Sequence, residues 1–429
     1  MDRDALSVVP EVSPVVGADH GSSTPVGSAP GGRGVFRALR DTPFRWYFGG
    51  QIASASGTFL QQTAIGWLVL QLTGSASSLG LVLAAGGLPT LLFGPWGGAL
   101  VDRFDTRRLL MFTQSVSGLL AAALWLTTAF GSGSLTVIIT INVLSGFVGV
   151  VDSPARQTFV SSLVPPSDLS SAISLNGVIM NSARVIGPAV AALIIVGAGP
   201  TPCFAINAVS YLAVVGALLV IRPIGAPGQR RPSGGGVLDG LRYARTRQQL
   251  WLPLAMMSLV GLLSFNFPVI LPVLATSTFH SGGGTYGLLS TMLSVGSVAG
   301  SFAVGLIPHP RRVYLLAAVL AFGACLTATA FAPNVTVACV TLVLTGASGF
   351  AFVTLASTAL QLHADPAYRG RVMALWVFVY LGTTPIGSAL TGWISAAAGP
   401  RAALAIGAGA CLLAAGLAAR VRTPVRRPE

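Results

Sequence analysis

The sequence predicts an all-α polytopic membrane protein, with twelve transmembrane helices that form two pseudo-symmetric halves of six helices each. Three observations predict this class. Apolar runs of about 20 residues, the length that crosses a bilayer core, recur along the chain. The charged residues, only 9% of the 429, gather in the gaps between these runs. Residues 366–422 also repeat the pattern of residues 166–222 at a separation of 200.

The composition excludes several classes of protein. With 53% hydrophobic residues spread over the whole chain, a soluble fold would have to bury nearly every segment in one core. Arginine alone carries the net charge of +13, and the arginines alternate with apolar runs, which disfavours nucleic acid as a partner. The four cysteines are dispersed without CxxC or Cys/His spacing, so no disulfide framework, metal site or cofactor is expected.

Clusters of glycine, proline, serine and charge separate the apolar runs and set the approximate limits of the spans. The predicted spans are 46–72, 79–101, 107–130, 135–157, 171–196, 201–222, 250–276, 285–307, 312–332, 335–360, 370–396 and 401–422. They define a first half at 43–222, a linker at 223–249 and a second half at 250–422. Residues 1–42 and 423–429 are expected to be tails, the first of them disordered because it is rich in Gly, Pro and Ser.

The arginines predict which way the spans point. If the N-terminus is cytoplasmic, the gaps on that side hold pairs such as Arg230 and Arg231, whereas the opposite side holds only Arg401. By the positive-inside rule, both termini are expected on the cytoplasmic side of the plasma membrane.

The second half of the linker has an amphipathic pattern. Apolar positions fall on one face of a helix and polar positions on the other: Leu238, Leu241 and Ala244 against Asp239, Arg242 and Arg245. The pattern predicts a short helix on the inner membrane surface, with a plain polar linker as the alternative.

The internal repeat indicates how the halves are related. Pro166 matches Pro366, "IGPAVAALI" matches "IGSALTGWI", and "AGP" ends at both Pro200 and Pro400. The shift crosses six helices, an even number, so both halves point the same way and an axis along the membrane normal relates them.

Several stretches resemble a known family. "GGALVDRFDTRR" resembles the signature between the second and third helices of the major facilitator superfamily. "SGTFLQQTAIGWLVLQLTGS", "DSPARQTFVSSLVP" and "NSARVIGPAVA" are similar to the subgroup of transmembrane secretion effectors, which includes enterobactin-type siderophore exporters and macrolide-type efflux proteins. The resemblance covers about residues 40–422 and implies the major facilitator fold and transport by alternating access, with no enzymatic activity.

The signature loop is the first candidate site, a cytoplasmic gate. Gly94, Gly97 and Gly98 let another helix approach closely, and Asp102 can face the positive N-terminal end of a helix. The resemblance implies that this helix is the eleventh span, near Gly370, so that Asp102 latches one half to the other. The alternative is that Arg103, Arg107 and Arg108 only set the topology and bind lipid phosphates.

Asp152 is the expected partner of Arg107 and Arg108, with Arg156 four residues further on the same helix. The resemblance also places an acidic residue of the fourth helix in this gate. In the second half, "GSFAVGLIPHPRR" keeps the arginine pair and lacks the Asp, so the latch is expected to be one-sided.

Arg184 is the single charge near the centre of a span, where an arginine costs about 2.5–3.5 kcal/mol on insertion scales. Asn181 lies on the same helical face. Two roles remain open for Arg184, because it can bind an anionic or carbonyl-rich substrate or pair with Asp152.

Other polar and aromatic residues of the spans are candidates for a substrate cavity. They are Thr58, Gln61 and Gln62 in the first span, Phe265 and Asn266 in the seventh, and Trp376 in the eleventh. Helix packing is the alternative for each of them. In the fifth span, Gly187 and Pro188 resemble the Gly-Pro pattern of exporters and predict a bend.

The leading hypothesis is a secondary transporter, expected to act as a monomer, that exports a small amphipathic drug, antibiotic or siderophore. Coupling to protons is implied only by the resemblance. An uptake or uniport transporter is the alternative within the superfamily. A non-transporting membrane enzyme or receptor is disfavoured, because the four histidines fall in tails or gaps and do not cluster.

Overall fold

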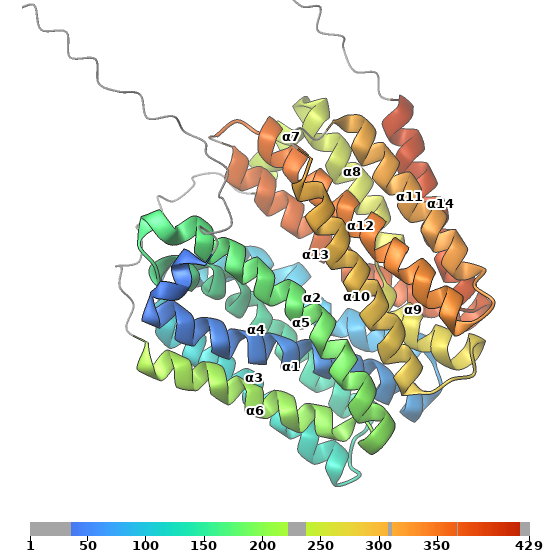
Figure 1. Ribbon diagram of the computed structural model, residues 1–429, viewed down its shortest axis with the longest axis horizontal. Helices are drawn as coiled ribbons and strands as arrows, with labels where there is room; N and C mark the ends of the chain where they lie inside the picture. The colour runs from blue at the N-terminus through green and yellow to red at the C-terminus, as the bar shows by residue number, and fades with distance from the viewer. Residues whose placement is uncertain (1–35, 222–236, 308–310, 367, 421–429) are drawn as a thin grey trace, which may run out of the picture.

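The computed structural model describes residues 36–221, 237–307, 311–366 and 368–420. The described residues are helices joined by short connections, without strands (Figure 1). The first half comprises α1 (Thr42–Thr73), α2 (Ala76–Val101), α3 (Thr106–Ala129), α4 (Leu135–Ser162), α5 (Leu169–Ala198) and α6 (Thr201–Val220). After α7 (Val237–Thr246), the second half comprises α8 (Gln248–Leu263), α9 (Phe267–Val273), α10 (Gly283–Gly305), α11 (Arg312–Ala330), α12 (Val335–His363), α13 (Arg369–Ala398) and α14 (Pro400–Arg420).

These helices confirm the predicted class of a multi-pass helical membrane protein. Among the described residues, 11 helical stretches are long and apolar enough to cross a membrane, and one of them, Gln248–Thr278, joins α8, α9 and the π-helical turn η3 (Leu274–Thr278). The 32-residue α1 is the remaining long helix, and its Gln, Ser and Thr side chains lower its hydropathy. The twelve predicted spans therefore correspond to these 11 stretches and α1.

The internal repeat is visible in the ends of equivalent helices. Ser134 and Asn334, 200 residues apart, both cap a helix by accepting a hydrogen bond from the backbone N–H three residues on. Gly199 and Gly399 end α5 and α13 at φ of 75° and 83°, a backbone conformation that favours glycine. The repeat found in the sequence at 166–222 therefore extends back to α4 and α12.

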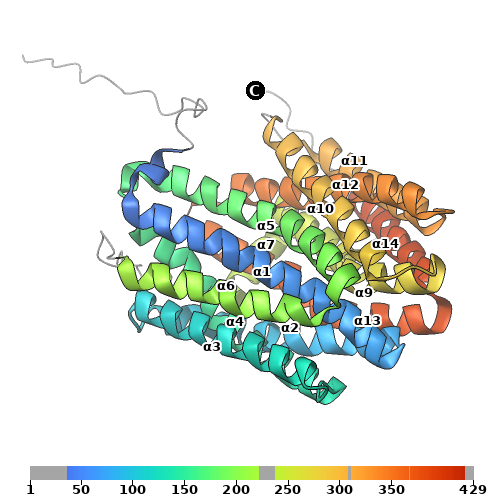
Figure 2. The ribbon, with the colours of Figure 1, turned by 60° about the horizontal axis from the view of Figure 1, so that its bottom comes forward.

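The two halves meet through two equivalent helix pairs, α2 with α13 and α5 with α10. Figures 1 and 2 show the halves in contact at the end where α5 meets α10, whereas their other ends diverge. A Cβ placed on Gly80 in α2 would lie 2.9 Å from the Cα of Gly392, and one on Gly287 in α10 would lie 2.7 Å from the Cα of Ala192. Small residues thus allow near-backbone contact at both pairs, as is usual between membrane helices.

At the opposite end of the molecule, the halves are separated at the predicted latch. Gly98 near the end of α2 and Gly370 in the first turn of α13 have no atoms within 4 Å of an added Cβ. The structure is therefore closed at the end of Gly80 and Gly287 and open at the end that holds the charged loop. Below, these are called the closed end and the open end.

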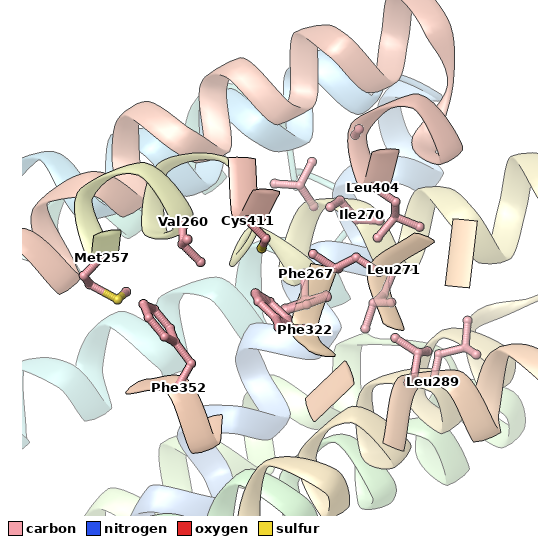
Figure 3. Packing of buried hydrophobic residues seen from close by; sticks show 14 of the residues in the cluster. Met257, Val260, Phe267, Ile270, Leu271, Leu289, Phe322, Phe352, Leu404 and Cys411 are labelled. Atoms are coloured by element: carbon pink, nitrogen blue, oxygen red, sulfur yellow. The ribbon is translucent and has the colours of Figure 1, made fainter. Parts of the chain in front are cut away.

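The second half has an apolar interior around a broken helix (Figure 3). Phe267, Phe322 and Phe352 pack there with residues of α8 and α14. Between α8 and α9, Ser264 donates a hydrogen bond to the carbonyl of Gly407 at 2.8 Å, and Asn266 donates one to the carbonyl of Leu262 at 2.8 Å. These side chains satisfy backbone groups near the break, which lipid could not do.

A short helix precedes the first span of each half. The 3-10 helix η1 (Arg37–Arg40) lies within the segment that was expected to be disordered, and Ala38 in it is buried against α5. The predicted linker helix is observed as α7, which packs on α8 and α13. The first half of the linker, residues 223–236, and the tail residues 1–35 and 423–429 lie outside the described residues.

Candidate functional site

The charged loop between α2 and α3 carries no inter-half contact in this structure. Asp102, Arg103 and Arg108 are exposed, and in the described part of the chain none of their side chains has a hydrogen bond or ion pair. The carboxylate of Asp105 accepts a hydrogen bond from the backbone N–H of Arg108 at 2.8 Å and caps α3. The contact predicted between Asp102 and the start of α13 is not present among the described residues, and the latch stays a prediction.

Of the three glycines predicted to allow a close helix approach near this loop, Gly97 is the one that does so, and Gly94 and Gly98 have no neighbour within 4 Å of an added Cβ. A Cβ on Gly97 would overlap the backbone of Val150 in α4, whereas Gly98 faces open space. The close approach therefore joins α2 to its own half and leaves the Gly98 face free.

Arg107 has a different partner from the one predicted. Its Nε donates to the carbonyl of Leu218 at 2.7 Å, and its Nη2 donates to the carbonyl of Leu219 at 2.9 Å. These carbonyls belong to the last turn of α6, where a cation is stabilised by the unpaired carbonyls and the helix dipole. The predicted pairing with Asp152 is wrong for Arg107 and also for Arg108, which is exposed.

Asp152 forms a buried polar cluster inside the first half. It makes an ion pair with Arg156 one turn further along α4, and it accepts hydrogen bonds from Thr113 at 2.8 Å and Gln114 at 2.7 Å. Three donors from α3 and α4, Thr113, Gln114 and Arg156, thus surround one carboxylate. The predicted relation of Asp152 to Arg156 is observed, but the cluster does not include the arginines of the charged loop.

Arg184 is not paired with Asp152, so the structural alternative for this residue is wrong. Its guanidinium carbon lies 4.6 Å from the ring centroid of Phe350 in α12 and 5.9 Å from that of Phe59 in α1. Cation–π attraction operates at such distances. Arg184 therefore lies between the two halves, with an aromatic ring from each.

Predicted cavity residues of the second half adjoin this position as a connected group of rings. Phe265 contacts Phe350 at 5.9 Å and Tyr380 at 6.5 Å between centroids, and Trp376 stacks on Tyr380 at 6.3 Å with an interplanar angle of 7°. We call Phe265, Phe350, Trp376 and Tyr380 the aromatic wall. It faces the only charge near the centre of a described span outside the Asp152 cluster.

The polar residues of α1 divide between packing and cavity positions. Thr58 lies 3.3 Å from the hydroxyl of Tyr211, and Gln61 accepts a hydrogen bond from Asn207 at 2.7 Å, so both pack on α6 within the first half. Gln62 is exposed, one helical turn from Gly66, which faces Tyr286 of α10. Of the three predicted residues, Gln62 is the one directed at the other half.

The remaining predicted residues have separate places. Asn181 is half-buried, one turn before Arg184 on α5. Asn266 is buried at the α8–α9 break, and its side chain lies against Gly387. Gly187 allows contact with the backbone of α1 at Leu60, 2.9 Å from an added Cβ, and α5 runs as one helix through the buried Pro188. A bend at Pro188 stays a prediction.

Sequence reasoning missed some of the residues that complete these sites. Phe350 and Tyr380 were not singled out, because aromatic residues within apolar spans carry no pattern that distinguishes a cavity from a core. Gln114 and Asn207 had a usable signal, since an amide in the middle of an apolar span needs a hydrogen-bonding partner. In the described residues no cluster of His, Cys, Asp and Glu is suited to hold a metal ion.

The family profile and the similar proteins of known name agree on one family of membrane transporters. The profile of the family described as transmembrane secretion effector matches residues 33–429. The staphyloferrin A transporter of Staphylococcus aureus is 26% identical over 361 residues, covering 81% of this chain and 88% of that protein. The multidrug efflux pump Tap of Mycobacterium tuberculosis is 28% identical over 362 residues, covering 81% and 86%. Macrolide efflux protein A of Streptococcus pyogenes is 22% identical, covering 81% and 88%.

Solved structures share the fold at low sequence identity. A bacterial homologue of the human lysosomal transporter Spinster, in an inward-facing and unoccupied conformation, superposes with a TM-score of 0.72 at 14% identity, covering 88% of this chain and 96% of that chain. The D-xylose–proton symporter superposes with a TM-score of 0.67 at 14% identity, covering 89% and 96%.

Proposed function

This chain belongs to the transmembrane secretion effector family of the major facilitator superfamily, and from that premise we propose that it exports a small amphipathic compound across the cytoplasmic membrane by alternating access. The observation that carries the proposal is the unequal packing of the two halves. They approach to backbone contact at Gly80 and Gly287 and are separated at Gly98 and Gly370. One state of alternating access requires such unequal packing, and Arg184 lies between the two halves.

The arginine distribution supports the open end as cytoplasmic. The charged loop, α7 and the arginine-containing first turn of α13 all lie there, and positive charge is enriched on the cytoplasmic face of membrane proteins. In this orientation the structure is an inward-open transporter, ready to take a compound from the cytoplasm or the inner leaflet.

The predicted gate acts when this end closes. Rocking of the halves brings Asp102 toward the N-terminal end of α13 near Gly370, where the helix dipole and Arg369 stabilise a carboxylate. The open space within 4 Å of a Cβ added to Gly98 or Gly370 supports this, because it leaves room for the two helices to approach. Arg103 and Arg108 stay at the membrane surface, while Arg107 holds α3 on α6 throughout.

Transport in everted membrane vesicles tests the proposal. Vesicles that contain the protein are given a panel of dyes, macrolides and siderophores, with and without an imposed proton gradient. Export from the cell appears as accumulation inside everted vesicles that exceeds that of vesicles without the protein. If no compound moves under either condition, the transport proposal is overturned.

The same assay separates the alternatives of direction and coupling. Accumulation only in right-side-out vesicles supports uptake, and equilibration without accumulation supports a uniporter. Accumulation that collapses with the proton gradient supports antiport. Asp152 is held by donors from its own half, so we expect coupling, if observed, to survive partly in Asp152→Asn, with the loss of stability measured separately.

A further inference from the structure

Arg184 is a cation without an anion at the centre of a membrane protein. It lies near the middle of the 30-residue α5 and is half-buried. The described part of the chain contains three ion pairs, Arg37–Asp168, Arg156–Asp152 and Arg247–Asp365, and none includes Arg184. Within the described residues, the Arg184 guanidinium donates no hydrogen bond either. A charged group in this environment calls for a partner, and the protein supplies only aromatic rings.

The rings around Arg184 belong to both halves, which limits the roles that the contact can have. Phe350, at 4.6 Å, comes from α12, and Phe59, at 5.9 Å, comes from α1 next to α5. If Arg184 served only to hold α5 against α1, its guanidinium would not need to contact a ring of α12. When the halves rock, the distance between α5 and α12 changes, so the Arg184–Phe350 contact belongs to the open state described here.

The surroundings of Arg184 favour a particular ligand chemistry. From Phe350 the aromatic wall continues through Phe265 to Tyr380, on which the buried Trp376 stacks. Arginine presents several N–H donors in a planar fork that matches a carboxylate or a similar oxyanion. Aromatic faces bind apolar or aromatic surface. A cation beside a row of rings is therefore complementary to an organic anion with an apolar body.

We infer that Arg184 is the anion-binding group of the substrate site, and that the transported compound is an amphipathic organic anion whose apolar body packs on the aromatic wall. The inference rests on the proposed transport function and names its substrate class. In this structure, the guanidinium lies over the ring of Phe350. The anion displaces this contact, and binding thereby releases a link between the halves.

A matched series of probes tests the charge preference. The probes are 1-pyrenebutyric acid, its methyl ester and 1-pyrenebutylamine, which share one apolar body and differ in charge. Binding to the purified protein in nanodiscs is followed by energy transfer from tryptophan to pyrene. The acid is expected to bind at least about tenfold more tightly than the ester, and the amine more weakly still. Equal binding of acid and ester, or no binding of the acid, overturns the inference.

Variants identify the residue responsible. Arg184→Gln removes the preference for the acid and leaves ester binding unchanged, and Arg184→Lys retains part of it. Arg401→Gln is the control, since Arg401 bonds to the carbonyl of Ala332 and removing it deletes the same charge elsewhere. An acid preference that persists in Arg184→Gln contradicts the inference, and so does one lost equally in Arg401→Gln.

Folding and transport are measured on the same variants, so that failures can be told apart. Thermal unfolding shows whether Arg184→Gln is folded, and the Lys variant serves if it is not. If neutral or cationic compounds accumulate in everted vesicles while the acid is not preferred, the export proposal stands and the anion site is wrong. If nothing accumulates while the acid binds through Arg184, the site stands and the export proposal is wrong.

Discussion

The two halves consist of equivalent helices, but the interior of the first half contains a polar cluster where that of the second half is apolar. In α4, the first half buries Asp152 and Arg156 in a cluster of hydrogen bonds, whereas the positions 200 residues later in α12 are Phe352 and Ala356, both fully buried in apolar packing. The backbone arrangement is therefore independent of this interior chemistry. What the polar cluster adds is a fixed orientation of α3 against α4, and the first half is also the one that carries the charged loop and Arg184.

The largest expected effect comes from breaking the buried ion pair of the first half. Asp152→Ala leaves Arg156 buried without its carboxylate, which costs about 3–5 kcal/mol in proteins. We expect a large fall in the thermal unfolding temperature of the purified protein. In the double variant Asp152→Leu/Arg156→Met, both charges are removed and much of the loss is recovered, since the first half then resembles the second. If the single and double variants unfold alike, the pair is not the reason for the loss.

The two inter-half contacts are expected to respond alike, because they are equivalent. A Cβ on Gly80 lies 2.5 Å from the carbonyl oxygen of Ser388, and one on Gly287 lies 2.7 Å from the Cα of Ala192. Gly80→Ala and Gly287→Ala should each destabilise the closed end by about 1–3 kcal/mol, the usual cost of overpacking. Spin-label distances across this end are expected to lengthen.

Gly409→Ala is the control for these two variants, because Gly409 in α14 has open space around it. This variant should be neutral or slightly more stable, as alanine favours helix. If only one of the two inter-half variants changes the distances, the closed end is held by one helix pair and the pseudo-symmetry of the contact is broken.

The fold could be predicted further from the sequence than the partners of individual side chains. Apolar runs and the 200-residue repeat are sufficient for the spans, because a helix in lipid satisfies its own backbone and depends little on its neighbours. The partner of Arg107 could not be found in this way. Backbone carbonyls at the end of α6 have no signature in the sequence, whereas Asp152 is a visible acid on the same side.

The central site shows the same limit. Arg184 stands out as a lone charge, but its contact with Phe350 depends on the angle between the halves, which no local pattern encodes. The repeat indicates which helices of the two halves are equivalent, but it does not give the distance between a residue of one half and a residue of the other. The repeat is also incomplete: the positions 200 residues after Asp152 and Arg184 hold Phe352 and Thr384. Arg184, for which substrate binding is proposed, is thus a position where the repeat keeps the helix and changes the chemistry.

A smaller loss of stability is expected when one arginine is removed from the arginine pair of either half. Arg107 donates two hydrogen bonds to the end of α6, so Arg107→Ala should cost about 1–2 kcal/mol of stability. Arg312, at the start of α11, has a buried Nε without a hydrogen bond in the described residues, and Arg312→Ala should change stability by less than about 0.5 kcal/mol. Chemical or thermal unfolding of both variants checks the difference. Equal losses would mean that both arginines cap a helix.

The smallest losses of stability are expected when the ion pairs that hold the short helix before each half are broken. Arg37 in η1 bonds to Asp168 before α5 at 3.1 Å, and Arg247 after α7 bonds to Asp365 before α13 at 2.9 Å. Each pair is at least partly exposed, so Arg37→Ala and Arg247→Ala should cost about 0.2–1 kcal/mol, less at high salt. Since Asp168 is the more buried acid, Arg37→Ala should cost more. Proteolysis at the ends of η1 and α7 measures local release, and a loss confined to the other half would contradict the equivalence.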